Sequence, residues 1–147
     1  MISFRNDYSE GAHPKVLEAL SRSNFDTTCG YSMDKYCARA ADTVRKLTAC
    51  PDADVHFLTG GTLANTIVIS RALRPWESVI AAETGHINVH ETGSIESAGH
   101  KVCAIPAPGG KLTPQLVREV MRIHVNGTDE HMVKPGMVYI SDATELG

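Results

Sequence analysis

The chain has 147 residues, of which 42% are hydrophobic and 21% are charged, a composition typical of a globular protein with a hydrophobic core. Its formal net charge is -3 with acidic and basic residues interspersed, so it lacks the basic surface expected of a protein that binds nucleic acid or an anionic membrane. Charged residues interrupt the N-terminal stretch and no apolar run is long enough to span a membrane, so we expect a cytoplasmic protein.

Helices and strands are predicted to alternate along the chain. In order, we expect helix 14–20, helix 36–47, strand 55–58, helix 63–73, strand 78–81, helix 87–98, strand 101–105, helix 114–123 and strand 137–140. This alternation predicts an α/β fold with a mainly parallel sheet. No repeat, low-complexity tract or flexible linker divides the sequence, which favours one folding unit.

A glycine turn connects the first predicted strand to an apolar helix. The turn contains Gly60, Gly61 and Thr62 and lacks the residues of a P-loop or of a dinucleotide-binding fingerprint. The start of a helix offers unpaired N–H groups to an anion, glycines let the anion approach the backbone, and the threonine hydroxyl adds a donor. The turn therefore favours a single phosphate group, and an ordinary helix cap is the alternative interpretation.

A second segment, directly after the strand predicted at 78–81, is rich in histidine and glutamate. His86 and His90 are four residues apart and could bind zinc together with Glu83 or Glu91, although the H-E-x-x-H pattern is absent. The histidines could also have a structural role only, or one imidazole could stack on an aromatic cofactor. In α/β sheets, ligands gather beyond the carboxyl ends of the strands, so this segment and the glycine turn are expected to face one ligand.

An ordered set of motifs resembles the low-specificity L-threonine aldolases, which belong to the aldolase and β-eliminating lyase group of fold-type-I pyridoxal-phosphate enzymes. The motifs are Arg5–Tyr8, Gly30–Asp34, Gly60–Asn65, His86 and Thr144–Gly147, and the resemblance covers essentially the whole chain. It implies the three-layer α/β/α large domain of the aspartate-aminotransferase-like fold, with residues 1–147 forming the N-terminal part of that domain.

The resemblance also implies the cofactor, pyridoxal 5'-phosphate, and the residues that bind it. Gly60, Gly61 and Thr62 match the residues around the cofactor phosphate. His86 matches a catalytic histidine that stacks on the pyridine ring and helps to move the proton of the substrate β-hydroxyl.

Three further residues match positions near the amino acid substrate. Asn6 corresponds to a position near the substrate carboxylate that is usually serine in relatives, so its role departs from the family pattern. Tyr31 resembles a tyrosine that reaches the site of a neighbouring subunit, and His131 resembles a histidine near the substrate hydroxyl. The family relation implies a homodimer or homotetramer.

The implied reaction cleaves L-threonine or L-allo-threonine into glycine and an aldehyde. The family places its Schiff-base lysine, the aspartate at the pyridine nitrogen and the arginine at the substrate carboxylate beyond the stretch that matches this chain. We therefore expect these 147 residues to be the N-terminal part of a longer enzyme and to be inactive alone. The alternatives are another pyridoxal-phosphate β-eliminating lyase, an aminotransferase, or a truncated, non-catalytic paralogue that binds a partner subunit.

Overall fold

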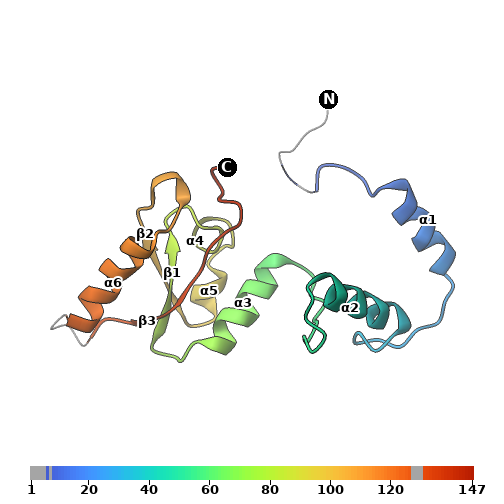
Figure 1. Cartoon of the computed structure of the whole chain (residues 1–147), viewed down its shortest axis with the longest axis horizontal. Helices are drawn as coiled ribbons and strands as arrows, with labels where there is room; N and C mark the ends of the chain where they lie inside the picture. Colours follow the sequence, from blue (N-terminus) through green and yellow to red (C-terminus); the bar gives the residue numbers. More distant parts are fainter. Residues whose placement is uncertain (1–5, 7, 127–130) are drawn as a thin grey trace. The chain divides into compact units, whose positions relative to one another are not determined.

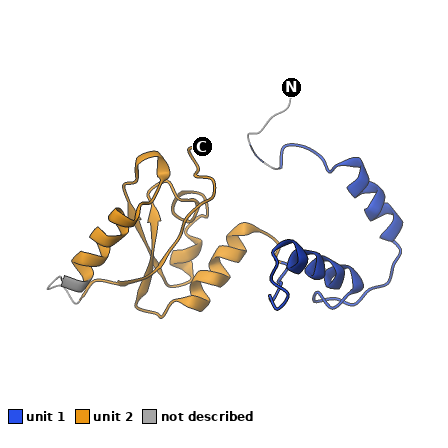
Figure 2. Cartoon of the chain, viewed as in Figure 1, with its two compact units in different colours: residues 1–57 blue, residues 58–147 orange. Residues whose placement is uncertain are grey.

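The computed structural model describes residues 6, 8–126 and 131–147. Contacts divide the chain into two compact units, residues 1–57 and residues 58–147 (Figure 2). The prediction that residues 1–147 form one part of a larger domain stays a prediction, and the described part of unit 1 has little core of its own. Ala41 is the one buried residue in the described part of unit 1.

Unit 1 contains helices α1 (Pro14–Ser23) and α2 (Lys35–Leu47), both of which were predicted. Helix α1 begins at its proline, which has no N–H group to leave unsatisfied. Helix α2 begins after Asp34, whose carboxylate accepts hydrogen bonds from the N–H groups of Tyr36 at 2.8 Å and Cys37 at 3.0 Å. Local capping residues thus set where both helices start.

Unit 2 is built on a parallel sheet of three strands, β1 (Glu77–Ala82), β2 (Lys101–Ile105) and β3 (Lys134–Val138). The strand order is β2-β1-β3, so β1 lies in the middle (Figure 1). Five of the six residues of β1 are buried. The strands predicted at 78–81 and 101–105 are confirmed.

Strand β3 differs from the predicted strand at 137–140 because it begins three residues earlier. It includes Pro135 and Gly136. Proline and glycine are uncommon within strands, so the sequence did not predict a strand at these residues. The pairing with β1 shifts here: Ser78 lies opposite Pro135 and Val79 lies opposite Met137, which leaves Gly136 as an extra residue. The irregular pairing accommodates both residues within the strand.

Helices cover both faces of the sheet. They are α3 (Gly61–Ala72), α4 (His86–Val89), α5 (Ser94–Ser97) and α6 (Pro114–Asn126), and a 3-10 turn, η1, spans Pro108–Gly110. The connections from β1 to β2 and from β2 to β3 cross the sheet in opposite directions, so right-handed crossovers place their helices on opposite faces. Figure 1 shows α6 on one side of the sheet and α3 and α5 on the other. Unit 2 therefore has the predicted three-layer α/β/α arrangement.

The main core lies between β1 and the helices α3, α4 and α5. Its buried side chains come from five elements and from the residue that follows α3: Ile69, Leu73, Val79, Ala81, Ile87, Ile95 and Val102. None of the helices in the described ranges is long and apolar enough to cross a membrane.

Two predicted elements were wrong. Residues 55–58 form no strand, because they pair with no strand in the described part of the chain, and Phe57 and Leu58 are each 44% exposed. The helix predicted at 87–98 is divided into α4 and α5, because Thr92 and Gly93 have positive φ angles of 54° and 69° that end a right-handed helix.

Candidate functional site

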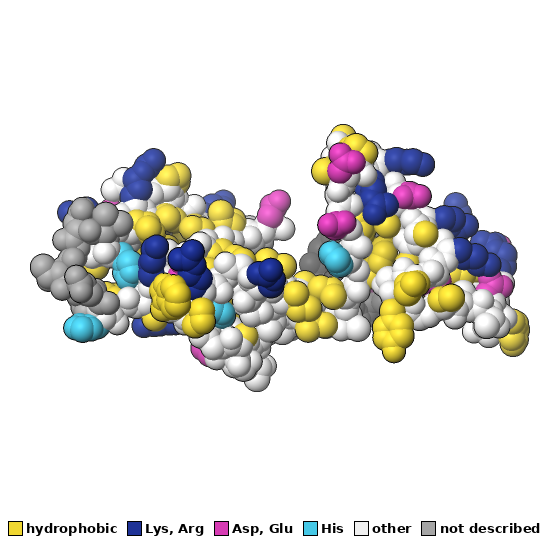
Figure 3. All heavy atoms as spheres, turned by 90° about the horizontal axis from the view of Figure 1, so that it is seen from below, with side chains coloured by type: hydrophobic (Ala, Val, Ile, Leu, Met, Phe, Trp, Pro, Cys, Tyr) yellow, Lys and Arg dark blue, Asp and Glu magenta, His cyan; other side chains and the backbone are white. Residues whose placement is uncertain are grey.

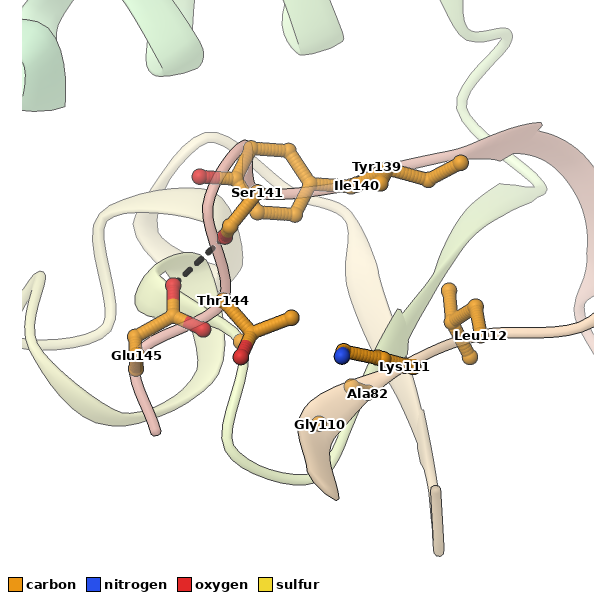
Figure 4. Close-up of a pocket in the computed structure, with 10 residues that line it drawn as sticks. Ala82, Gly110, Lys111, Leu112, Tyr139, Ile140, Ser141, Thr144 and Glu145 are labelled. Atoms are coloured by element: carbon orange, nitrogen blue, oxygen red, sulfur yellow. Dashed lines mark hydrogen bonds between the residues drawn. The ribbon is translucent and has the colours of Figure 1, made fainter. Parts of the chain in front are cut away.

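The loops that follow all three strands meet at the carboxyl edge of the sheet in unit 2. They line a pocket of about 290 Å³ (Figure 4). Its lining residues are Ala82 and Gly85 after or within β1, Gly110, Lys111 and Leu112 after β2, and Tyr139, Ile140, Ser141, Thr144 and Glu145 after β3. This edge is where α/β sheets bind ligands.

His86 begins helix α4, four residues after β1 ends, and lies beside this pocket. Its imidazole Nδ1 is 2.8 Å from Oε1 of Glu91. The His86 side chain is 46% exposed and the Glu91 side chain is completely buried. One edge of the ring is thus fixed by a buried carboxylate, while the rest of the ring remains accessible.

Glu91 also connects His86 to helix α3. Its Oε1 accepts a hydrogen bond from Asn65 Nδ2 at 2.6 Å, and its Oε2 accepts one from the Ser94 hydroxyl at 3.0 Å. Three donors therefore surround one buried carboxylate, which is the condition under which a buried charge is stable. The helix that carries the glycine turn and the histidine segment are joined through this side chain.

A second carboxylate, that of Glu145, holds the backbone of His86. Its Oε1 accepts hydrogen bonds from the His86 N–H group at 2.8 Å and from the Ser141 hydroxyl at 2.5 Å, the latter drawn in Figure 4. Partial burial raises the pKa of Glu145, but the hydrogen bonds from Ser141 and from the backbone, together with the nearby His86 ring, outweigh burial and leave the pKa below its ordinary value. The loop after β3 is thereby attached to the start of α4.

The glycine turn opens helix α3 as predicted. The Ala64 N–H donates the first hydrogen bond of the helix, to the Gly60 carbonyl at 3.1 Å. The N–H groups of residues 61–63 come before it in the sequence and therefore have no acceptor within the helix. Among the described residues, no side chain caps the helix, and a Cβ atom added at Gly60 or Gly61 would meet none of their atoms within 4 Å. Together with the exposed Thr62, these N–H groups form a donor set that fits a monoester phosphate.

The other predicted site residues lie in other parts of the chain. Asn6 and Tyr31 belong to unit 1, where the Asn6 Oδ1 accepts hydrogen bonds from Tyr8 N–H and the Ser9 hydroxyl, and Tyr31 is fully exposed. His131 precedes β3, at the amino edge of the sheet, whereas His86 follows the carboxyl end of β1. The substrate-binding roles of these three residues stay predictions.

The two histidines considered as zinc ligands lie close together. The His86 and His90 rings have centroids 5.5 Å apart at an angle of 58°. Within the described residues, no group of three or more His, Cys, Asp and Glu side chains is arranged to hold a metal ion. The Glu91 carboxylate is instead occupied by hydrogen bonds to His86, Asn65 and Ser94.

Sequence reasoning missed the partners that hold His86. Glu91 was considered only as a metal ligand, and Asn65 and Glu145 only as parts of longer motifs. Glu91 lies between Ile87 and Ile95 at intervals of four residues, and all three are buried, so an acidic residue within an apolar stripe was the available signal. No comparable signal marks Glu145, which is 59 residues from His86 in the sequence.

A model of the beta-eliminating lyase family matches residues 4–147. The low specificity L-threonine aldolase of a Pseudomonas species is 38% identical over 146 residues, and that of Pseudomonas aeruginosa is 33% identical over the same length. Both alignments cover 98% of this chain but 41% of the relative. A solved structure of Leishmania major threonine aldolase is 51% identical, with a TM-score of 0.89, over 97% of this chain and 41% of that chain.

Proposed function

Since the chain belongs to the beta-eliminating lyase family, we propose that it is the N-terminal part of a pyridoxal-phosphate-dependent carbon–carbon lyase that cleaves L-threonine or L-allo-threonine into glycine and an aldehyde. The names of the relatives support this activity. The observation that carries the proposal within the chain is the network from Asn65 through Glu91 to His86, because it joins a phosphate-sized donor set to an accessible imidazole.

The first turn of α3 would hold the cofactor phosphate. The N–H groups of residues 61–63 and the Thr62 hydroxyl supply neutral donors, and the positive end of the helix dipole favours the dianion. Gly60 and Gly61 leave open space in front of these donors. When bound, pyridoxal phosphate would supply the electron sink that allows a Cα–Cβ bond to break.

His86 would orient the aromatic ring and take part in proton transfer. Its Nδ1 is engaged by Glu91, so Nε2 is the ring atom that can accept the proton of the substrate β-hydroxyl as the bond breaks. Glu145 holds the His86 backbone and keeps the residue at the carboxyl edge of the sheet. Both carboxylates would limit ring movement, and restricting the reacting groups in this way favours one reaction geometry.

The chain spans 41% of the length of the relatives, so the remaining groups of the reaction are expected in the part of those proteins that the chain does not match. We propose that these 147 residues alone do not turn over threonine. We also propose a homodimer or homotetramer, which large exposed apolar side chains in both units support, among them Leu20, Tyr31, Ile140 and Leu146. Figure 3 shows hydrophobic side chains, in yellow, at the surface of the face viewed.

The test is to purify the protein from its own gene, determine its intact mass and oligomeric state, and record its absorbance between about 400 and 430 nm with pyridoxal phosphate. A band that borohydride bleaches, with glycine and acetaldehyde formed from L-threonine, would support the proposal. Formation of a keto acid and ammonia would favour the alternative lyase or aminotransferase. A protein that neither binds the cofactor nor turns over an amino acid, but co-purifies with a full-length relative, would favour the non-catalytic subunit.

A further inference from the structure

We propose that Glu91 is a positioning residue that holds the neutral His86 ring in the tautomer with hydrogen on Nδ1 and fixes the ring relative to the first turn of α3. This inference rests on the proposed function for the identity of the ligand, because it assigns the phosphate-binding turn and the imidazole to one cofactor. The tautomer itself depends only on contacts between residues of this chain.

The first step concerns the charge on Glu91. Its carboxylate receives hydrogen bonds from the Asn65 amide N–H, the Ser94 hydroxyl and the His86 ring, and its side chain is completely buried. Three donors satisfy an ionised carboxylate, which can only accept. Burying a carboxylate without these donors would cost free energy, so the folded state favours the arrangement in which all three donors contact Glu91.

The second step concerns the tautomer. Nδ1 of His86 is 2.8 Å from Oε1 of Glu91, and two acceptors at that distance would repel each other. Nδ1 therefore carries a hydrogen, and in the neutral ring Nε2 keeps its lone pair. Without the carboxylate, nothing else in the described contacts of Nδ1 would favour this tautomer.

The third step concerns the position of the ring. The same oxygen, Oε1 of Glu91, accepts from Asn65 and from His86. Asn65 lies four residues after Gly61, about 6 Å along the helix axis and on the same side of α3. A shift of α3 would move this oxygen and with it the imidazole, so the phosphate-binding turn and the ring keep a fixed separation.

The segment that carries Glu91 is itself anchored. Its carbonyl accepts a hydrogen bond from Ser94 N–H at 3.1 Å, and its neighbours in the apolar stripe, Ile87 and Ile95, are buried to 1% and 0% exposure. Moving the carboxylate would require these core side chains to move. This anchoring distinguishes Glu91 from Glu96, an exposed glutamate in α5, which we use as the control.

The experiment measures the His86 tautomer by ¹⁵N NMR in the whole protein, labelled with ¹⁵N-histidine, at a pH where the imidazole is neutral. A His86→Gln variant identifies the signals. Glu91→Met removes the acceptor at nearly constant length, Glu91→Gln restores an acceptor oxygen without the charge, and Glu96→Met makes the same change at the exposed position. The dissociation constant of pyridoxal phosphate is determined for each protein by absorbance titration.

We expect hydrogen on Nδ1 in the wild type, in Glu96→Met and in Glu91→Gln, and a change toward hydrogen on Nε2 in Glu91→Met. We expect Glu91→Met to bind the cofactor about tenfold more weakly, the lower end of the loss seen when the carboxylate behind a metal-binding histidine is removed. A wild-type ring with hydrogen on Nε2 overturns the proposal even if the methionine variant does not fold, and so does a Glu91→Met protein with the wild-type tautomer. The expected tautomer in a protein that does not bind pyridoxal phosphate would refute the proposed function and the cofactor part of this inference, but not the role of Glu91 in setting the tautomer.

Discussion

Replacing Thr62 by valine removes one hydroxyl from the first turn of α3 and leaves the backbone donors unchanged. Thr62 is exposed at the second position of the helix, where its side chain can reach an anion bound to the N–H groups of residues 61–63. A hydrogen bond to a charged group contributes about 1.5–3 kcal/mol. We therefore expect Thr62→Val to raise the dissociation constant of pyridoxal phosphate about 10- to 150-fold, measured by absorbance titration of the whole protein.

The matched control is Thr66→Val, which makes the same chemical change one turn further along α3. The Thr66 hydroxyl already donates to the Thr62 carbonyl at 2.8 Å, so it is not available to a ligand at the start of the helix. We expect Thr66→Val to bind the cofactor as the wild type does. Equal affinities of the two variants would show that the Thr62 hydroxyl does not contact the cofactor phosphate, and this residue's place in the proposed cofactor site would be wrong.

Three further predictions concern unfolding free energies, measured by denaturant titration. Ile95→Ala removes a completely buried side chain and should cost about 2–5 kcal/mol. Ile123→Ala, at a position 58% exposed, should cost less than about 1 kcal/mol. Similar losses for the two variants would contradict the core assigned to unit 2. Because the pKa of Glu145 is lowered in the folded state, its stabilising contribution is present above its ordinary pKa and is lost as the pH falls through the lowered pKa. Glu145→Gln should remove this part of the pH dependence of the unfolding free energy. If the variant lost stability at acidic pH as the wild type does, the assignment would be refuted. Gly110→Ala should destabilise the protein more than Gly99→Ala. Both glycines have positive φ angles, but a Cβ atom at Gly110 would lie 2.9 Å from a threonine hydroxyl, whereas one at Gly99 would meet no described atom within 4 Å. Equal losses of unfolding free energy would mean that the loop around Gly110 relaxes.

The helices that begin at strong local signals could be predicted from the sequence. Pro14 and Asp34 set the starts of α1 and α2, and Thr113 before Pro114 starts α6, where the Thr113 hydroxyl accepts from Leu116 N–H at 3.3 Å. Capping acts over a few residues, so the information is contained in the local sequence. The glycine turn before α3 was likewise predicted from neighbouring residues, although no described side chain caps that helix.

The strands depended on their neighbours. Residues 55–58 have the apolar character of a strand but pair with no other strand in the described residues. Pro135 and Gly136, in contrast, lie within β3 because the pairing with β1 accommodates one extra residue. A strand is stabilised by pairing and by burial of its faces, so propensity alone could not decide either case.

The sequence by itself determined the family, the α/β class, the glycine turn and the candidate role of His86, because each of these rests on residue types at short and fixed spacings. Only the tertiary structure decided what holds His86 in place. Glu91 becomes its partner after α4 has ended at Val89, and Glu145 reaches its backbone across 59 residues of sequence. Hydrogen bonds between distant residues depend on how the strands are ordered in the sheet, and that order brings the loops after β1 and β3 together at one edge.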